Sequence, residues 1–189
     1  MAPKYSRDDI ANRLPLLEAY KYDNTLEARD VYYGNVTGGK IIFGYDYADK
    51  DTDVYPIRSE HGTHVAGTVA AVNNNGTGVA GVAGGNGTGN GVRIMSVQIF
   101  DGQQSSTLAK NAKGIEYAAD NGASILQNSW GYPGSGLSAN DSLFEQGYSV
   151  EYIALNYFMS QSNCSAMTGG VVIFAAGNEE YSEGIYPGA

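Results

Sequence analysis

The sequence predicts an α/β fold, a three-layer sandwich on a mostly parallel central sheet that is incomplete in this chain. Three observations support this. Compact apolar runs alternate with longer helical segments, Gly- and Asn-rich stops separate them, and 42% of the 189 residues are hydrophobic. A helix between two strands makes a right-handed crossover, so the strands run parallel and helices cover both faces of the sheet.

The elements follow each other in a regular order. Residues 1–39 form a lead-in of uncertain structure, in which 8–20 has helical spacing that Pro15 restricts to a short helix. Compact apolar runs predict strands at 40–47, 92–100, 123–129 and 171–176. Periodic runs, two of them stopped by Asn and Gly, predict helices at 61–72, 107–120 and 150–160, with 131–143 as a loose connection. Because no repeat or linker divides 40–189, we expect one domain there.

Composition narrows the classes of partner. The chain has 11 Lys and Arg against 20 Asp and Glu, a net charge of −9, which argues against nucleic acid or an anionic membrane surface as partner. The longest apolar run, 171–176, is too short to span a bilayer, and the first nine residues hold no apolar signal core. A single cysteine, Cys164, excludes an internal disulfide framework and a multi-thiolate metal site.

Two short motifs suggest a dinucleotide site and a zinc site, but neither has the residues or the context that such a site needs. Residues 76–81 match the dinucleotide pattern G-x-G-x-x-G, but they follow a predicted helix rather than a strand, so a flexible surface loop explains them better. A nucleotide-binding protein remains a weaker alternative. His61 and His64 are the only histidines, and no third histidine or paired cysteine completes a zinc site.

The segment HGTHVAGTVAA at 61–71 resembles the histidine motif of the subtilisin-like serine proteases, the subtilases. Further blocks resemble that family in the family's own order: GVAGVA at 78–83, VRIMSVQIF at 92–100, GIEYA at 114–118, ILQNSWG at 125–131 and VVIFAAGNE at 171–179. A chance match of collinear blocks is improbable. The resemblance implies that 40–189 is a partial subtilase catalytic domain, a serine-type endopeptidase that hydrolyses peptide bonds by acyl transfer.

The resemblance also implies roles for individual residues. His61 would be the general base and His64 a structural histidine, while Asn178 would donate its side-chain amide to the oxyanion and Gly177 would let the strand end turn. A peptide would bind as an added strand between two segments: Gln104, Ser105 and Ser106 on one side, and Ser129, Trp130 and Gly131 on the other. Phe100 and Trp130 would line substrate pockets if exposed, with core packing as the alternative.

Two members of the family's catalytic triad are not recognisable. No Asp-Ser/Thr-Gly turn precedes the histidine, and no Gly-Thr-Ser-Met-Ala helix start follows the asparagine. Asp30 lies at a plausible distance before His61, but Glu-Ala-Arg at 27–29 does not form the buried strand that normally presents the aspartate. We therefore expect the Asp and Ser segments to belong to a longer protein, and the isolated chain to show no turnover. The alternative is a catalytically inactive, peptide-binding pseudoprotease.

Other partners are implied only weakly. The reaction requires no cofactor, and structural calcium is left open at two places. One is the acidic loop with Asp46, Asp49, Asp51 and Asp53, and the other is the loop at 73–79, where Asn side chains and carbonyls offer hard oxygen ligands. The expected partner is a peptide or protein substrate. The resemblance alone implies an extracellular or cell-envelope location.

Overall fold

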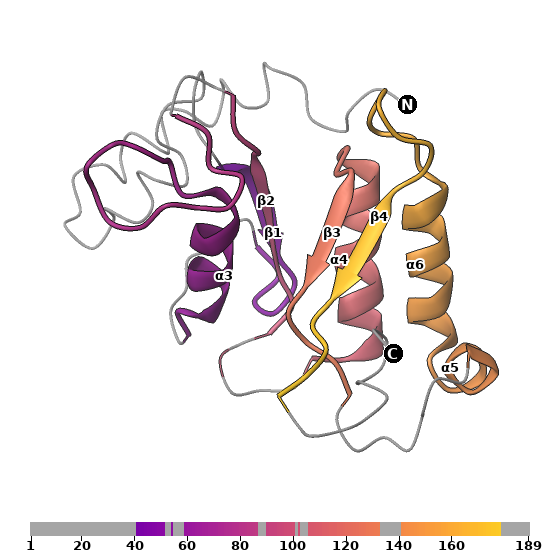
Figure 1. Cartoon of the computed structure of the whole chain (residues 1–189). Coiled ribbons are helices and arrows are strands. Elements are labelled where there is room, and N and C mark those ends of the chain that lie inside the picture. The colour runs from indigo at the N-terminus through magenta and orange to yellow at the C-terminus, as the bar shows by residue number, and fades with distance from the viewer. Residues whose placement is uncertain are drawn as a thin grey trace. The chain divides into compact units, whose positions relative to one another are not determined.

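The computed structural model describes residues 41–51, 54, 59–86, 90–100, 102, 106–132 and 141–178 (Figure 1). The short helix predicted at 8–20 and Asp30 lie outside this set. The chain forms two compact units, Met1–Ser105 and Ser106–Ala189, and each is described by itself.

The first unit contains a pair of parallel strands, β1 (Ile41–Asp46) and β2 (Ile94–Gln98). Gly44 lies opposite Ser96, and a Cβ added to this glycine would come within 2.0 Å of the Ser96 carbonyl oxygen. The close approach of the two backbones therefore requires glycine at position 44. The strands predicted at 40–47 and 92–100 are confirmed, each slightly shorter than expected.

Helix α3 (His61–Ala70) ends where a glycine-rich loop returns over it. The backbone N–H groups of Val82 and Ala83 donate to the carbonyl oxygens of Thr68 and Val69 at 2.9 and 2.8 Å, which satisfies carbonyls that the helix end leaves free. Gly84 is buried here, and glycine is required because a Cβ at this position would lie 1.7 Å from the Ala71 carbonyl oxygen. The prediction of a surface loop is therefore confirmed for residues 76–80, which are exposed. The part of the loop that follows them is hydrogen-bonded to the end of α3.

Among its described residues, 106–132 and 141–178, the second unit contains three helices and two strands: α4 (Leu108–Asp120), β3 (Ile125–Asn128), α5 (Asp141–Gly147), α6 (Ser149–Ser160) and β4 (Val171–Phe174). The strands are parallel, with Ile125 opposite Val171 and Asn128 opposite Phe174. Helices α4 and α6 lie beside this pair (Figure 1). The α/β class with parallel strands is thereby confirmed.

Local sequence signals set the ends of α4. The Thr107 side chain accepts a hydrogen bond from the Lys110 N–H at 3.2 Å, and so caps the first turn. Gly122 has a φ of +89°, the left-handed conformation that ends a helix. The helix predicted at 107–120, with its Asn-Gly stop, is confirmed. None of the helices in the described part of the chain is long and apolar enough to cross a membrane.

Helix α5 was not expected, because residues 131–143 were interpreted as a loose connection. It begins at Asp141 and buries the Phe144 ring. This ring contacts the ring of Tyr148, directly before α6, and the ring of Tyr152 on α6. These contacts come from outside the segment itself. Its helical state therefore depends on tertiary packing that local residue spacing does not show.

The core of the second unit lies mainly between α4 and α6. Its buried side chains include Ala112, Ile115, Tyr117, Ala118, Ala119, Phe144, Ala154, Leu155 and Phe158. Phe158 has an exposed fraction of 0%. Gly170, just before β4, makes room for it, since a Cβ there would lie 2.6 Å from the Phe158 ring. Strand β4 can therefore approach α6 closely only where glycine precedes it.

Candidate functional site

The candidate residue of the first unit is His61, the first residue of α3. Its side chain is exposed, and its backbone N–H donates to the Ser59 hydroxyl oxygen at 3.3 Å. His64, one turn later, is exposed as well, and its N–H donates to the Glu60 carbonyl at 2.9 Å. The predicted exposed start of the helix is confirmed. An exposed imidazole at such a position can exchange protons with a bound molecule.

The candidate region of the second unit, described by itself, is the edge where β3 and β4 end. Because the strands are parallel, their carboxyl ends meet at one edge, and the ladder continues one step further through the Ala175 N–H, which donates to the Asn128 carbonyl at 2.9 Å. The segment 129–131 and the segment leading to Asn178 leave the sheet here. The structure thus brings these two sequence-predicted groups to one edge.

Two residues shape the ends of these strands. Asn128 is buried, and its amide donates to the Ile173 carbonyl across the strand pair at 3.2 Å. Sequence reasoning missed this contact, although an Asn at the end of an apolar run is a visible polar signal. Gly177 has a φ of +99°, so the chain turns immediately before the exposed Asn178, as the sequence predicts.

Trp130 is held between two aromatic rings. Its ring meets Phe174 edge-on at 5.3 Å between centroids and Tyr132 at 5.9 Å. The side chain is half-buried, so Trp130 is neither a core residue nor fully exposed, while Phe100 in the first unit is 36% exposed. Edge-on contacts of this kind stabilise one ring orientation. The Trp130 ring therefore presents a fixed apolar surface at the strand edge.

The remaining residues of the predicted substrate segments have simple surroundings. Ser129 accepts a hydrogen bond from the Gln127 side chain at 2.9 Å, and Gly131 is half-buried. Ser106 precedes α4 and is half-buried too. Gln104 and Ser105 lie outside the described residues. The segment 129–131 is thus the part of the predicted substrate site that the structure describes in full.

A buried polar group, which we call the Glu151 cluster, joins this edge to the helices. The Glu151 carboxylate oxygen Oε1 accepts hydrogen bonds from the Asn111 amide at 2.5 Å and from the Tyr132 hydroxyl at 2.6 Å. The Asn111 amide also donates to the Tyr132 hydroxyl oxygen at 3.1 Å. Burial raises the pKa of Glu151, and these two hydrogen bonds oppose that rise. The sequence gives no signal for the cluster, because its members come from separate elements.

In the acidic loop at the end of β1, one carboxylate is bound by backbone groups of the loop itself. Asp46 is buried, and its carboxylate accepts the N–H groups of Ala48 at 2.6 Å and Asp49 at 3.0 Å. Burial raises the pKa of Asp46 although these hydrogen bonds lower it. Across the described residues, which do not include Asp53, no three His, Cys, Asp or Glu side chains gather to hold a metal ion. Calcium stays a prediction.

These features define an α/β protein in which the segments carrying Ser129 and Asn178 follow the carboxyl ends of two parallel strands, the usual place for a site in such sheets. The subtilase family profile matches residues 28–188. The chain therefore belongs to the subtilase family, as its motifs predict.

Relatives agree with this assignment. The chain is 37% identical over 149 residues to the thermophilic serine proteinase of Bacillus sp. (strain AK1), covering 79% of this chain and 31% of that protein. It is 36% identical over 149 residues to thermitase of Thermoactinomyces vulgaris, covering 79% and 44%. The chain thus spans less than half the length of these relatives. The crystal structure of the nisin leader peptidase NisP from Lactococcus lactis aligns with a TM-score of 0.47 and 22% identity, over 76% of this chain and 41% of that one.

Proposed function

We propose that residues 40–189 are part of the catalytic domain of a subtilisin-like serine endopeptidase, which binds peptides at the 129–131 segment and cleaves them by acyl transfer. The observation that supports this most directly is the shared edge where β3 leads into Ser129 and β4 leads toward Asn178. A peptide bound along one segment would place its carbonyl group near an amide donor on the other. Membership of the subtilase family supports the same reaction.

The proposed roles follow from what each side chain can do. His61, exposed at its helix start, would take the proton of the attacking nucleophile and return it to the leaving amine. Asn178, exposed after the turn at Gly177, would stabilise the developing oxyanion through its side-chain amide. The serine nucleophile and the aspartate that orients the imidazole would come from segments of a longer protein.

The second candidate function is a peptide-binding pseudoprotease. The observation that favours it is the lack of a recognisable nucleophile motif in this sequence. The exposed His61 and Asn178 favour the enzyme, since a module that only binds peptides has no need of either. Both functions use the same strand edge, so peptide binding alone does not separate them.

A fluorophosphonate probe, which labels an activated serine covalently, separates the two functions. The chain itself should bind peptides but show neither labelling nor turnover of a chromogenic peptide. The flanking coding DNA, read in the same frame, should supply an Asp-Thr-Gly block upstream and a Gly-Thr-Ser-Met block downstream. The longer protein should then be labelled, and His61→Ala should abolish the labelling. A longer protein that binds peptides without being labelled would establish the pseudoprotease instead.

Further proposals rest on family membership alone. We place the protein outside the cell or in the cell envelope, with a peptide or protein as its substrate. No cofactor takes part in the proposed reaction. Structural calcium in the loop at 73–79 would raise the melting temperature on addition of millimolar calcium, and EDTA would reverse that rise.

A further inference from the structure

The Glu151 cluster connects three separate parts of the second unit. Glu151 lies on α6, Asn111 lies on α4, and Tyr132 is the residue directly after the 129–131 segment. The three hydrogen bonds among them form a closed ring, in which each side chain contacts both others. The cluster therefore attaches the chain just beyond the proposed peptide-binding segment to both core helices.

The attachment reaches the binding segment through Tyr132. Its hydroxyl group donates to Glu151, while its ring meets the Trp130 ring at 5.9 Å and an angle of 78°. The Tyr132 ring also contacts the ring of Tyr148, with 4.6 Å between the ring centroids. Trp130 in turn meets Phe174 at the end of β4. The orientation of Trp130 thus depends on a tyrosine whose own position the buried cluster fixes.

Burying the polar groups of this cluster costs the protein free energy of folding. Glu151 is 0% exposed, and its second carboxylate oxygen, Oε2, has no hydrogen-bond partner, as is also true of the Asn111 side-chain oxygen. Burying such groups lowers stability, and apolar side chains of similar volume would fill the site at lower cost. A purely structural role explains a buried carboxylate poorly, whereas a need for one fixed hydrogen-bond geometry explains it well.

We propose that Glu151 is a positioning residue, which together with Asn111 fixes Tyr132 and thereby sets how Trp130 meets the side chain of a bound peptide. This inference rests on the proposed function, because it assumes that the peptide lies along 129–131. It deepens that function by assigning part of the side-chain selectivity to a buried carboxyl group that does not touch the peptide. The expected ligand is a peptide with an apolar side chain facing Trp130.

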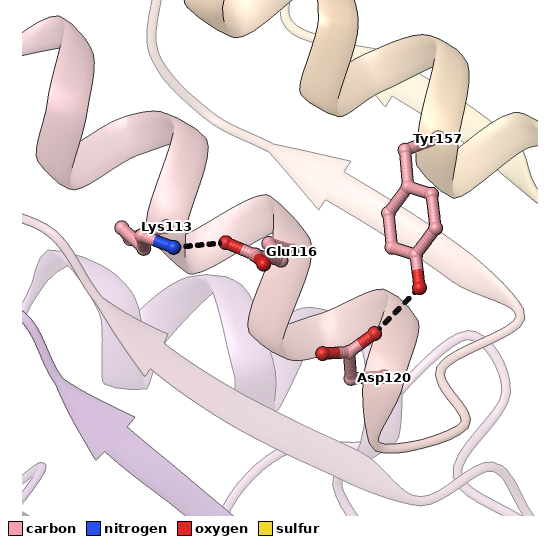
Figure 2. Close-up of polar contacts among 4 residues, drawn as sticks. All are labelled: Lys113, Glu116, Asp120 and Tyr157. Carbon is pink, nitrogen blue, oxygen red and sulfur yellow. Dashed lines mark hydrogen bonds and ion pairs between the residues drawn. The ribbon is translucent and has the colours of Figure 1, made fainter.

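The chain offers a matched control for this idea. Tyr157 on α6 donates to the Asp120 carboxylate on α4 at 2.7 Å, so it too joins the two helices through a tyrosine hydroxyl and a carboxylate (Figure 2). The rings that meet Trp130 edge-on are those of Tyr132 and Phe174. Tyr157→Phe therefore removes a helix-to-helix hydrogen bond of the same kind without changing the Glu151 cluster.

Trp130 is the only tryptophan of the chain, so its fluorescence reports on this segment alone. The variants are Glu151→Leu, which removes the acceptor, Glu151→Gln, which keeps an acceptor oxygen, Tyr132→Phe, which removes only the hydroxyl, and Tyr157→Phe. Emission maximum and acrylamide quenching are measured first, together with the melting temperature. Binding of acetylated tetrapeptide amides, with one position varied from Ala to Phe, is then followed by the same emission.

Glu151→Leu and Tyr132→Phe should shift the emission, increase quenching, weaken binding about three- to tenfold and reduce the preference for Phe over Ala. Glu151→Gln and Tyr157→Phe should match the wild type in emission and binding. The inference is overturned if both Glu151→Leu and Tyr132→Phe leave emission and quenching unchanged, or if Tyr157→Phe produces the same changes. A wild-type chain that binds none of the peptides contradicts the proposed function, while the emission data still decide whether Glu151 fixes the segment.

Discussion

Replacing Phe158 with alanine should unfold the second unit at much lower denaturant concentration. The ring is 0% exposed, and a buried Phe→Ala change costs about 3–5 kcal/mol. The neighbouring backbone at Gly170 already approaches the ring as closely as glycine permits, and β4 is tied to β3, so the cavity has little freedom to collapse. We therefore expect about 4 kcal/mol, a large share of the roughly 5–15 kcal/mol that stabilises a typical domain.

Urea unfolding followed by far-UV circular dichroism and by Trp130 emission measures this loss. With a slope of about 2 kcal/mol per molar urea, the midpoint should fall by about 2 M. Met159→Ala is the control, because Met159 is the next residue on α6 and 43% exposed, and its midpoint should move by less than about 0.5 M. If the two variants shift the midpoint equally, the packing of α6 against the start of β4 does not stabilise this unit as argued.

Three further predictions follow from other contacts. Burial raises the pKa of Glu151 above its ordinary value of 4.5, so its stabilising contribution is present at acidic pH and is lost as the pH rises through the raised pKa. Urea titrations from pH 4 to 8 should therefore show Glu151→Gln gaining stability relative to the wild type, and a pH-independent difference would contradict this. Thr107→Ala should lower stability by about 1 kcal/mol through the lost cap of α4, whereas Thr107→Ser should keep most of it; equal melting temperatures for the two variants would disprove the capping role. In the longer protease that we propose, Asn178→Ala should lower kcat by about 10²–10³-fold, the general range for loss of a subtilisin oxyanion donor, and a loss confined to KM would argue against this role.

In the described part of the chain, all four strands and three of the four helices could be predicted from local sequence. The compact run at 171–176 became β4, and the Asn-Gly pair after α4 ended it through a positive φ at Gly122. Helix α5 could not be predicted in this way, because the burial of Phe144 depends on rings from α6. Likewise, the glycines after α3 indicated a loop, but not that Gly84 would be buried against the helix end.

In the candidate site, too, some residues could be predicted from sequence motifs and others could not. The histidine and asparagine motifs predict roles for His61 and Asn178, since their residue types and order carry the resemblance. The structure shows both side chains exposed, and their roles stay predictions. The Glu151 cluster could not be predicted, because a glutamate on a helix is ordinarily solvated. Its partners Asn111 and Tyr132 also lie far from it in the sequence. Burial and pairing of polar side chains are properties of the folded chain rather than of any local pattern.

The return of the glycine-rich loop over α3 has a practical consequence for engineering. The N–H groups of Val82 and Ala83 donate to carbonyl oxygens in the last turn of α3, so these two residues fix how the loop meets the helix. The exposed residues 76–80 take no part in these two hydrogen bonds. An epitope tag or a fluorophore-bearing insertion within 76–80 would leave the helix end intact, whereas a single residue added between Gly81 and Val82 would displace both of those hydrogen bonds by one position.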